Sequence, residues 1–200
     1  MASQVSICNL ALSRIGIKKY IDSIDERSDE ARVLKQVWTE AVEQALAVAP
    51  WPFAIRRAAL APDSGTVPEE WGYAFTYPAD CVHAIRIEDS LQVRRPDEAT
   101  AFAMEGAESG TARRIVCDVE EPVLVYVARI LHVPAWTPEF RDALAWLLAA
   151  EIAMPLVGTQ EVAEYARKMW WFQRNAAMAS YLTEQTPPAP PVSELEASRL

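Results

Sequence analysis

Proline is unevenly distributed along this chain, and that distribution limits what the chain can fold into. Of the 14 prolines, seven recur at short intervals between residues 62 and 138. Because proline removes a backbone donor and clashes with the preceding turn, long helices are not expected in this segment. Residues 1–61 and 139–185 contain only three prolines between them and repeat their apolar residues every three or four positions. The pattern predicts helices towards both ends and short strands between them.

Two helices are expected before the proline-rich segment. Ser3 is a suitable N-cap for the first helix, and Gly16 suits its C-terminal stop. Ser28 caps a longer second helix that ends before Pro50. Its apolar stripe consists of Ala31, Leu34, Trp38, Ala41, Ala45 and Val48. Residues 51–55 are apolar but contain Pro52, so we expect a packed, extended connection in which Trp51 and Phe53 belong to the core.

The middle segment contains short runs rich in β-branched and aromatic residues, which predict a small antiparallel sheet with long loops. The runs are residues 81–87, 91–94, 114–117 and 123–130.

Two further helices are expected after the sheet. Thr137 caps the first of them, with Pro138 at its first position, and Pro155 and Gly158 are expected to break it. Thr159 caps the last helix. Its predicted core face comprises Val162, Tyr165, Ala166, Met169, Phe172 and Ala176. Trp170 and Trp171 point about 100° apart on a helix, so at least one of them lies off that face and is a possible subunit contact.

The expected fold class is α+β. The N- and C-terminal helices, residues 1–61 and 137–185, form an antiparallel helical bundle with a small β-rich lobe, residues 62–136, inserted between them. Residues 186–200 form a proline-rich tail that we expect to dock on a neighbouring protein. The residues assigned to that docking are Pro187, Pro188, Pro190, Pro191, Val192, Leu195 and Leu200.

The charge balance argues against tight binding of nucleic acid. The chain has 28 acidic and 19 basic residues, a formal net charge of −9, and most of the acidic excess lies in residues 62–136. Phosphate-binding surfaces need clustered Lys and Arg, whereas an acidic surface lets DNA pass without sticking. Three widely spaced cysteines and no signal peptide suggest assembly in a reducing cytoplasm, and no stretch is apolar and long enough to span a membrane.

Few residues are candidates for a catalytic or metal-binding role. Cys81 and His83 are two apart on a predicted strand and should face the same side, but His132 and scattered carboxylates are the only further ligands for a metal or catalytic site. Asp80 follows a proline turn and is expected to bond nearby backbone amides. Arg56 and Arg57 are expected to pair with an acidic neighbouring subunit rather than with phosphate. With six glycines the chain has no phosphate-binding loop, so neither a cofactor nor an enzymatic role is expected.

Four motifs, in order, resemble the tail tubular protein A family of phage head–tail adaptors. Residues 8–16 (CNLALSRIG) are similar to N-x-A-L-x-x-I/L-G, and residues 50–57 (PWPFAIRR) to P-W-x-F-A-x-R-R. Residues 71–81 (WGYAFTYPADC) are similar to W-x-Y-A-Y-x-Y-P-x-D-C. Tyr126 with Arg129, residues 136–140 and residues 144–153 resemble the closing strand and the L-A-x-x-L-A helix. The match covers residues 5–180.

The resemblance implies a virion structural protein at the neck, assembled in the host cytoplasm. Its copies would form a ring, dodecameric in the family, that binds the portal protein on one side and a stopper or nozzle protein on the other. Double-stranded DNA would pass through the lumen without being read. The alternative is a monomeric protein-binding module or regulator that uses the tail as a peptide ligand.

Overall fold

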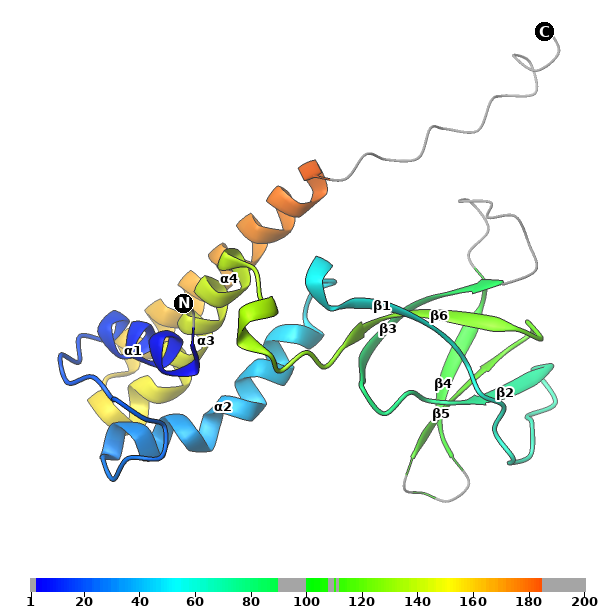
Figure 1. Cartoon of the computed structure of the whole chain (residues 1–200), viewed down its shortest axis with the longest axis horizontal. Coiled ribbons are helices and arrows are strands. Elements are labelled where there is room, and N and C mark those ends of the chain that lie inside the picture. The colour runs from blue at the N-terminus through cyan, green and yellow to red at the C-terminus, as the bar shows by residue number, and fades with distance from the viewer. Residues whose placement is uncertain (1–2, 90–99, 108–109, 111, 185–200) are drawn as a thin grey trace, which may run out of the picture.

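The computed structural model describes residues 3–89, 100–107, 110 and 112–184. In that part of the chain the fold is α+β, with four α-helices and two antiparallel sheets of three strands each. Figure 1 shows the helices gathered at one end of an elongated molecule and the strands at the other. The predicted α+β class is therefore confirmed.

The first two helices begin at the predicted capping residues. Helix α1 spans Gln4–Arg14, where the Ser3 amide donates to the Ser6 hydroxyl (2.9 Å) and the Ser6 amide donates to the Ser3 hydroxyl (3.1 Å). Helix α2 spans Asp29–Ala47 and is capped by the Ser28 hydroxyl. These hydroxyls satisfy amides that a helix leaves unpaired at its start.

The end of α2 differs from the prediction. The helix ends at Ala47, so Val48, the last residue of the predicted apolar stripe, is its C-cap and is 37% exposed. Val42 and Leu46 are buried on that face.

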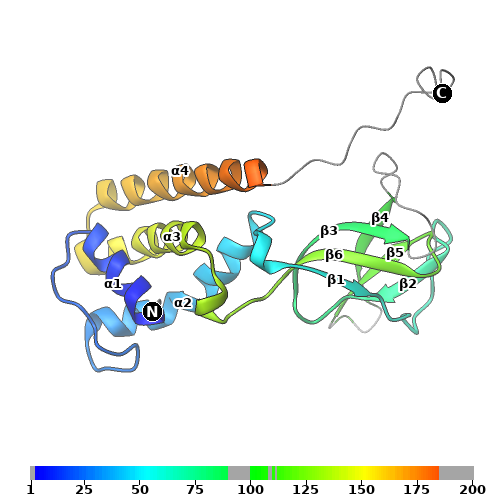
Figure 2. The same cartoon turned by 45° about the horizontal axis from the view of Figure 1, so that its top comes forward.

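Helix α3 (Pro138–Val157) is central to the helical part. Thr137 caps it, and the helix contacts α1, α2 and α4 (Gln160–Glu184). Ten of its residues are buried, which agrees with the broad apolar face seen in the sequence. In Figure 2, α4 runs alongside α3.

Pro155 does not break α3, contrary to prediction. The helix continues to Val157 and ends at Gly158, whose φ of 73° lies in the left-handed region that glycine adopts without strain. The Gly158 amide donates to the carbonyls of Ala153 and Met154, both at 3.1 Å. A proline so close to the end of a helix removes a single backbone hydrogen bond, and the packed helix tolerates that loss.

The strands pair into two sheets instead of the single one expected. The first sheet has the order β1–β6–β3 and the second the order β2–β5–β4. Their facing sides enclose a second apolar cluster that includes Phe75, Ile115 and Leu124. The strands are β1 (Ile55–Ala59), β2 (Tyr73–Thr76), β3 (Cys81–Asp89), β4 (Phe102–Gly106), β5 (Arg113–Cys117) and β6 (Pro122–Ala128).

The predicted runs at 81–87, 114–117 and 123–130 correspond to β3, β5 and β6, whereas the run at 91–94 lies outside the described residues. The sequence did not predict β1, β2 and β4. Residues 51–55, expected to be extended, instead contain a short 3-10 helix, Pro52–Ala54, followed directly by β1. Strands therefore begin at Ile55, within the segment that had been grouped with the helices.

The two segments that join helices to strands are anchored in one aromatic cluster. Trp51 and Trp136 pack edge-to-face on Phe140, with ring centroids 4.8 and 5.1 Å away. The Trp51 indole N–H donates to the Ala45 carbonyl at 2.7 Å, and that of Trp136 donates to the Ile130 carbonyl at 2.8 Å. Each of the two segments that join helices to strands is thus anchored by one buried tryptophan ring and the hydrogen bond that its indole N–H donates.

Candidate interaction surface

Helix α4 docks on α3 through a narrow face. Ala166, Trp170 and Ala177 are buried, and Val162 and Ala163 are partly buried against the same core. Seven residues separate Trp170 from Ala177, so they lie on the same side of the helix. This face is narrower than the apolar arc of α4, and the rest of that arc is uncovered.

Three large aromatic side chains lie on the uncovered side. Phe172 is 64% exposed, Tyr165 56% and Trp171 48%. Tyr165 and Phe172 belong to the predicted core face, as does the exposed Ala176, so the prediction was wrong for these three residues. We call Tyr165, Trp171 and Phe172 the outer face of α4. Exposed aromatic groups of this kind are typical of protein contact surfaces.

Tyr165 is held in place by a chain of ring contacts. It packs edge-to-face on Trp146 of α3 with the centroids 5.9 Å apart. The Arg14 guanidinium lies 4.2 Å from the centroid of the Trp146 ring. The same group forms an ion pair with Asp142. Arg14 also donates to the Asp142 carbonyl at 2.8 Å. Residues of α1 and α3 therefore fix the base on which Tyr165 of α4 rests.

Trp171 is held by two neighbours on its own helix. The Arg174 guanidinium lies 4.1 Å from the centroid of the Trp171 ring, and the Trp170 ring packs against it edge-to-face at 5.4 Å. A side chain that is already ordered loses less conformational entropy on binding. Tyr165 and Trp171 are therefore preorganised as contact residues.

The two adjacent tryptophans separate as the helix geometry requires. Trp170 is only 5% exposed and belongs to the helical core, although its buried indole N–H has no hydrogen-bond partner among the described residues. Of the pair, only Trp171 is available to a partner in this structure.

Arg56 and Arg57 already have partners within the chain. They are neighbours on β1 and point to opposite sides of it. Arg56 pairs with Asp80 at 3.1 Å, and Arg57 with Glu88 at 3.3 Å. Burial opposes ionisation of Glu88, but Arg86 and Arg57 outweigh it and lower the Glu88 pKa. A contact of either arginine with a neighbouring subunit remains a prediction and would have to compete with these pairs.

Cys81 and His83 do not face the same side, contrary to prediction. Cys81 lies opposite Ala128 of β6 while His83 lies opposite Val127, because a bulge between them shifts the register. Cys81 is buried between the sheets and His83 is exposed. Burial raises the pKa of the Cys81 thiol, so it stays protonated at neutral pH. A thiolate–imidazole pair is not formed.

The carboxylate of Asp80 bonds to two side chains and not, as predicted, to nearby backbone amides. Its carboxylate accepts hydrogen bonds from the Tyr126 hydroxyl at 3.0 Å and from Arg56 at 3.1 Å. Burial and this hydrogen bond raise the pKa of Tyr126. Asp80 also borders a hollow of about 480 Å³ between α2 and the start of β3, where Arg129 pairs with Glu43 at 2.6 Å. The spacing of these residues in the sequence did not indicate the hollow.

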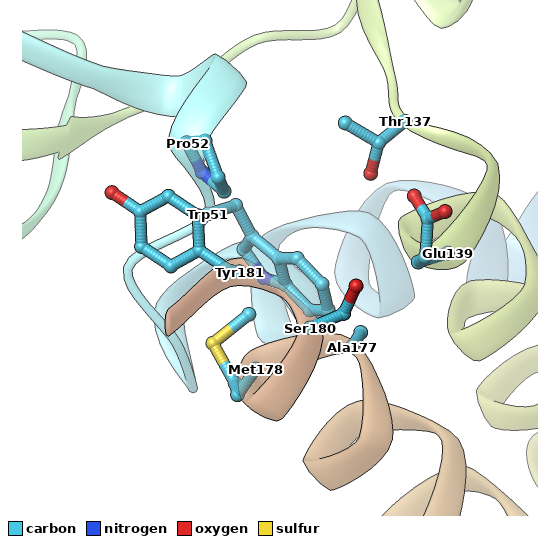
Figure 3. A pocket seen from close by; sticks show the side chains of 8 residues that line it. All are labelled: Trp51, Pro52, Thr137, Glu139, Ala177, Met178, Ser180 and Tyr181. Atoms are coloured by element: carbon cyan, nitrogen blue, oxygen red, sulfur yellow. The ribbon is translucent and has the colours of Figure 1, made fainter. Parts of the chain in front are cut away.

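A second hollow lies where the end of α4 meets the two connecting segments. Figure 3 shows the side chains of Trp51, Met178 and Tyr181 around it. Its volume is about 40 Å³, which is close to that of one water molecule and too small for a metabolite. This second hollow is therefore not a candidate site for a metabolite.

Other predictions concern residues beyond those described. Pro187, Pro188, Pro190, Pro191, Val192, Leu195 and Leu200 all lie outside them. Within residues 3–89, 100–107, 110 and 112–184, no three His, Cys, Asp or Glu side chains are grouped so as to hold a metal ion. Over the same residues, none of the helices has the length and apolar character needed to cross a membrane. No model of a known protein family matches the chain, and no curated protein matches it in sequence.

Proposed function

We propose that this protein is a structural subunit of a phage virion, a head–tail adaptor whose copies form a ring between the portal and the next neck or tail protein. The observation that carries the proposal is the outer face of α4, where three large aromatic side chains are exposed and two of them are held in fixed positions. Such a surface is unfavourable in water unless a partner covers it. A neighbouring copy in the ring covers it in this proposal.

The order of the four sequence motifs supports the same function. Asn9 of the first motif ties α1 to the loop after it, because its amide group exchanges two 2.9 Å hydrogen bonds with the backbone of Ile21. Trp51 of the second motif anchors a connecting segment, and Asp80 and Tyr126 of the later motifs bond to each other. In the proposal, helices from both parts of the chain form one antiparallel bundle around α3, and the strands form an inserted lobe.

The acidic excess of residues 62–136 supports a role in conducting DNA. A channel lined with carboxylates repels the phosphate backbone at every position, so DNA slides without binding. The proposed mechanism is therefore mechanical and electrostatic: the ring seals the junction and lets the duplex pass.

The test is light scattering after size-exclusion chromatography, on the protein alone and mixed with the portal protein of the same phage. The proposal predicts a complex that contains many copies of this chain bound to the portal ring. A protein that stays monomeric beside the portal and in assembled particles contradicts it. Deleting residues 187–200 separates the alternative, because a module that binds through its tail loses its partner completely, whereas a ring subunit keeps its lateral contacts.

A further inference from the structure

The proline-rich tail continues directly from the helix that carries the outer face. Helix α4 ends at Glu184, and the chain then runs on to residue 200. In the extended conformation that proline favours, residues 185–200 span about 50 Å, at roughly 3.1 Å per residue. Phe172 and Tyr165 lie only about 18 and 29 Å back from Glu184 along the helix axis, at roughly 1.5 Å per residue. The tail is therefore long enough to reach the whole outer face of its own helix.

The apolar residues of the tail match the spacing of the exposed rings. Tyr165 and Phe172 are seven residues, or about 10 Å, apart and lie on nearly the same side of α4. Val192 and Leu195 are three residues apart, which is one turn of a polyproline II helix and about 9 Å, so they also share a side. A tail that uses about two residues to turn back after Glu184 and then runs antiparallel to α4 brings residue 192 level with Phe172. The same register brings residue 195 level with Tyr165.

The charge between the two rings is complementary to that of the tail. Lys168 lies between Tyr165 and Phe172 in the sequence, is exposed, and forms no ion pair among the residues that the structure describes. Glu194 lies between the two apolar residues of the tail, so in the same register its carboxylate comes level with the Lys168 ammonium. An antiparallel second copy of α4 would instead bring two Lys168 side chains together, and like charges repel.

We propose that the tail of each free subunit folds back on the outer face of its own α4. Val192 then lies against Phe172. Leu195 lies one turn further along the tail, against Tyr165. Aromatic surfaces are the usual docking sites of proline-rich segments, because such a segment is already extended and loses little entropy on binding.

The contact between the tail and α4 does not depend on ring formation, but its consequence rests on the proposed function. A neighbouring copy that arrives in the ring displaces the tail from the outer face. The released tail is then free to dock on a neighbouring protein. The tail would therefore cover the aromatic residues only until assembly.

The covalent link to α4 makes a weak contact sufficient. A short link gives the tail an effective concentration of about 1 mM at its own helix. A contact with an intrinsic Kd of about 100 µM would then cover the outer face in roughly nine of ten molecules. The same contact would weaken the binding of a second tail from solution by about tenfold.

Fluorescence anisotropy with a labelled synthetic peptide of residues 186–200 tests the contact on the full-length protein. Val192→Ser together with Leu195→Ser disables the chain's own tail and leaves α4 unchanged. This variant should bind the peptide about tenfold more tightly than the wild-type protein, because its own tail no longer competes. Adding Phe172→Asp should abolish the binding, whereas adding Tyr20→Asp, at a similarly exposed residue in the loop after α1, should not.

Three results of this titration overturn the inference. They are equal affinities of the wild-type and tail variants, no binding to either protein, and unchanged binding after Phe172→Asp. Far-UV circular dichroism checks that each variant is folded.

Cysteine cross-linking within one full-length chain tests the register. The three native cysteines are all buried, so introduced thiols can be oxidised selectively. Tyr165→Cys with Leu195→Cys should form an intrachain disulfide several-fold faster than Arg167→Cys with Leu195→Cys. Arg167 is also exposed but lies about 160° around the helix from Tyr165.

Equal rates for the two cysteine pairs refute the register. Disulfides that form only between chains show that the tail docks on another copy, which also overturns the inference. Both experiments use the isolated protein, and binding to the portal is measured separately. The tail contact and the ring assignment can therefore fail independently.

Discussion

Replacing Trp51 with phenylalanine tests how the helical and strand ends of the molecule are joined. The Trp51 side chain is 1% exposed, and its indole N–H donates to the Ala45 carbonyl near the end of α2. A helix leaves its last carbonyls unpaired, and the indole satisfies one of them. Phenylalanine keeps an aromatic ring against Phe140 but removes the donor.

The expected cost comes from two sources. A buried carbonyl left without its partner costs about 1–3 kcal/mol. The smaller ring leaves a cavity in a close-packed site, which adds about 1 kcal/mol. The sum is a loss of about 2–4 kcal/mol in the free energy of unfolding, or roughly 5–15 °C in Tm for a chain of this size.

Urea unfolding followed by far-UV circular dichroism measures this difference, because the substitution alters tryptophan fluorescence directly. Trp171→Phe is the matched control: its ring is half exposed and its loss should change the free energy of unfolding by less than about 0.5 kcal/mol. If Trp51→Phe were as stable as the control, the indole hydrogen bond would not hold the joint, and the reasoning would be refuted.

Two further predictions concern the strand region. Arg114 is buried, pairs with Glu105 at 3.1 Å and donates to the Thr66 carbonyl at 2.8 Å, so Arg114→Met should cost about 2–3 kcal/mol in urea unfolding. The exposed Arg32, paired with Asp29, is the control, and Arg32→Met should cost at most about 0.5 kcal/mol; equal losses would contradict the assignment. Burial raises the Tyr77 pKa to about 12, whereas an unfolded tyrosine ionises near pH 10. The unfolded state therefore loses its proton first as the pH rises, and the free energy of unfolding falls between about pH 10 and 12. Tyr77→Phe should be no less stable at pH 7, because the buried hydroxyl has no well-formed hydrogen bond. Between about pH 10 and 12 its free energy of unfolding should fall less steeply than that of the wild-type protein. An equal fall with pH in the two proteins would be inconsistent with this account.

The helices could be predicted from the sequence because their signals are local. Ser3, Ser28 and Thr137 cap helices in the structure as expected, and Gly158 ends α3 through a positive φ. Capping depends on residues within one turn of the helix end, so the ends of these helices can be predicted from a few neighbouring residues.

The strands were harder to predict from the sequence because strand formation depends on pairing with residues distant in the chain. Strand β4 contains Ala103, Glu105 and Gly106, which have low strand propensity, and it forms because β5 offers a complete antiparallel register. Strand β1 begins directly after the 3-10 helix and pairs with residues about 70 positions later. The bulge that turns His83 away from Cys81 likewise arises in the pairing with β6.

The candidate surface was predicted in part. The adjacency of Trp170 and Trp171 correctly indicated that one of them would leave the core. The apolar arc of α4 is too wide to reveal which side meets α3, and the structure places Trp170 inwards and Tyr165 and Phe172 outwards. The side of α4 that meets α3 is determined by packing against Trp146 and the rest of α3. This packing cannot be predicted from the sequence of α4 alone.

Electron cryo-microscopy of assembled phage particles measures the central claim directly. The account predicts a closed ring of this chain next to the portal, with Tyr165, Trp171 and Phe172 of each copy covered by an adjacent protein chain. A neck that lacks the chain, or one in which these three side chains face solvent, would contradict it.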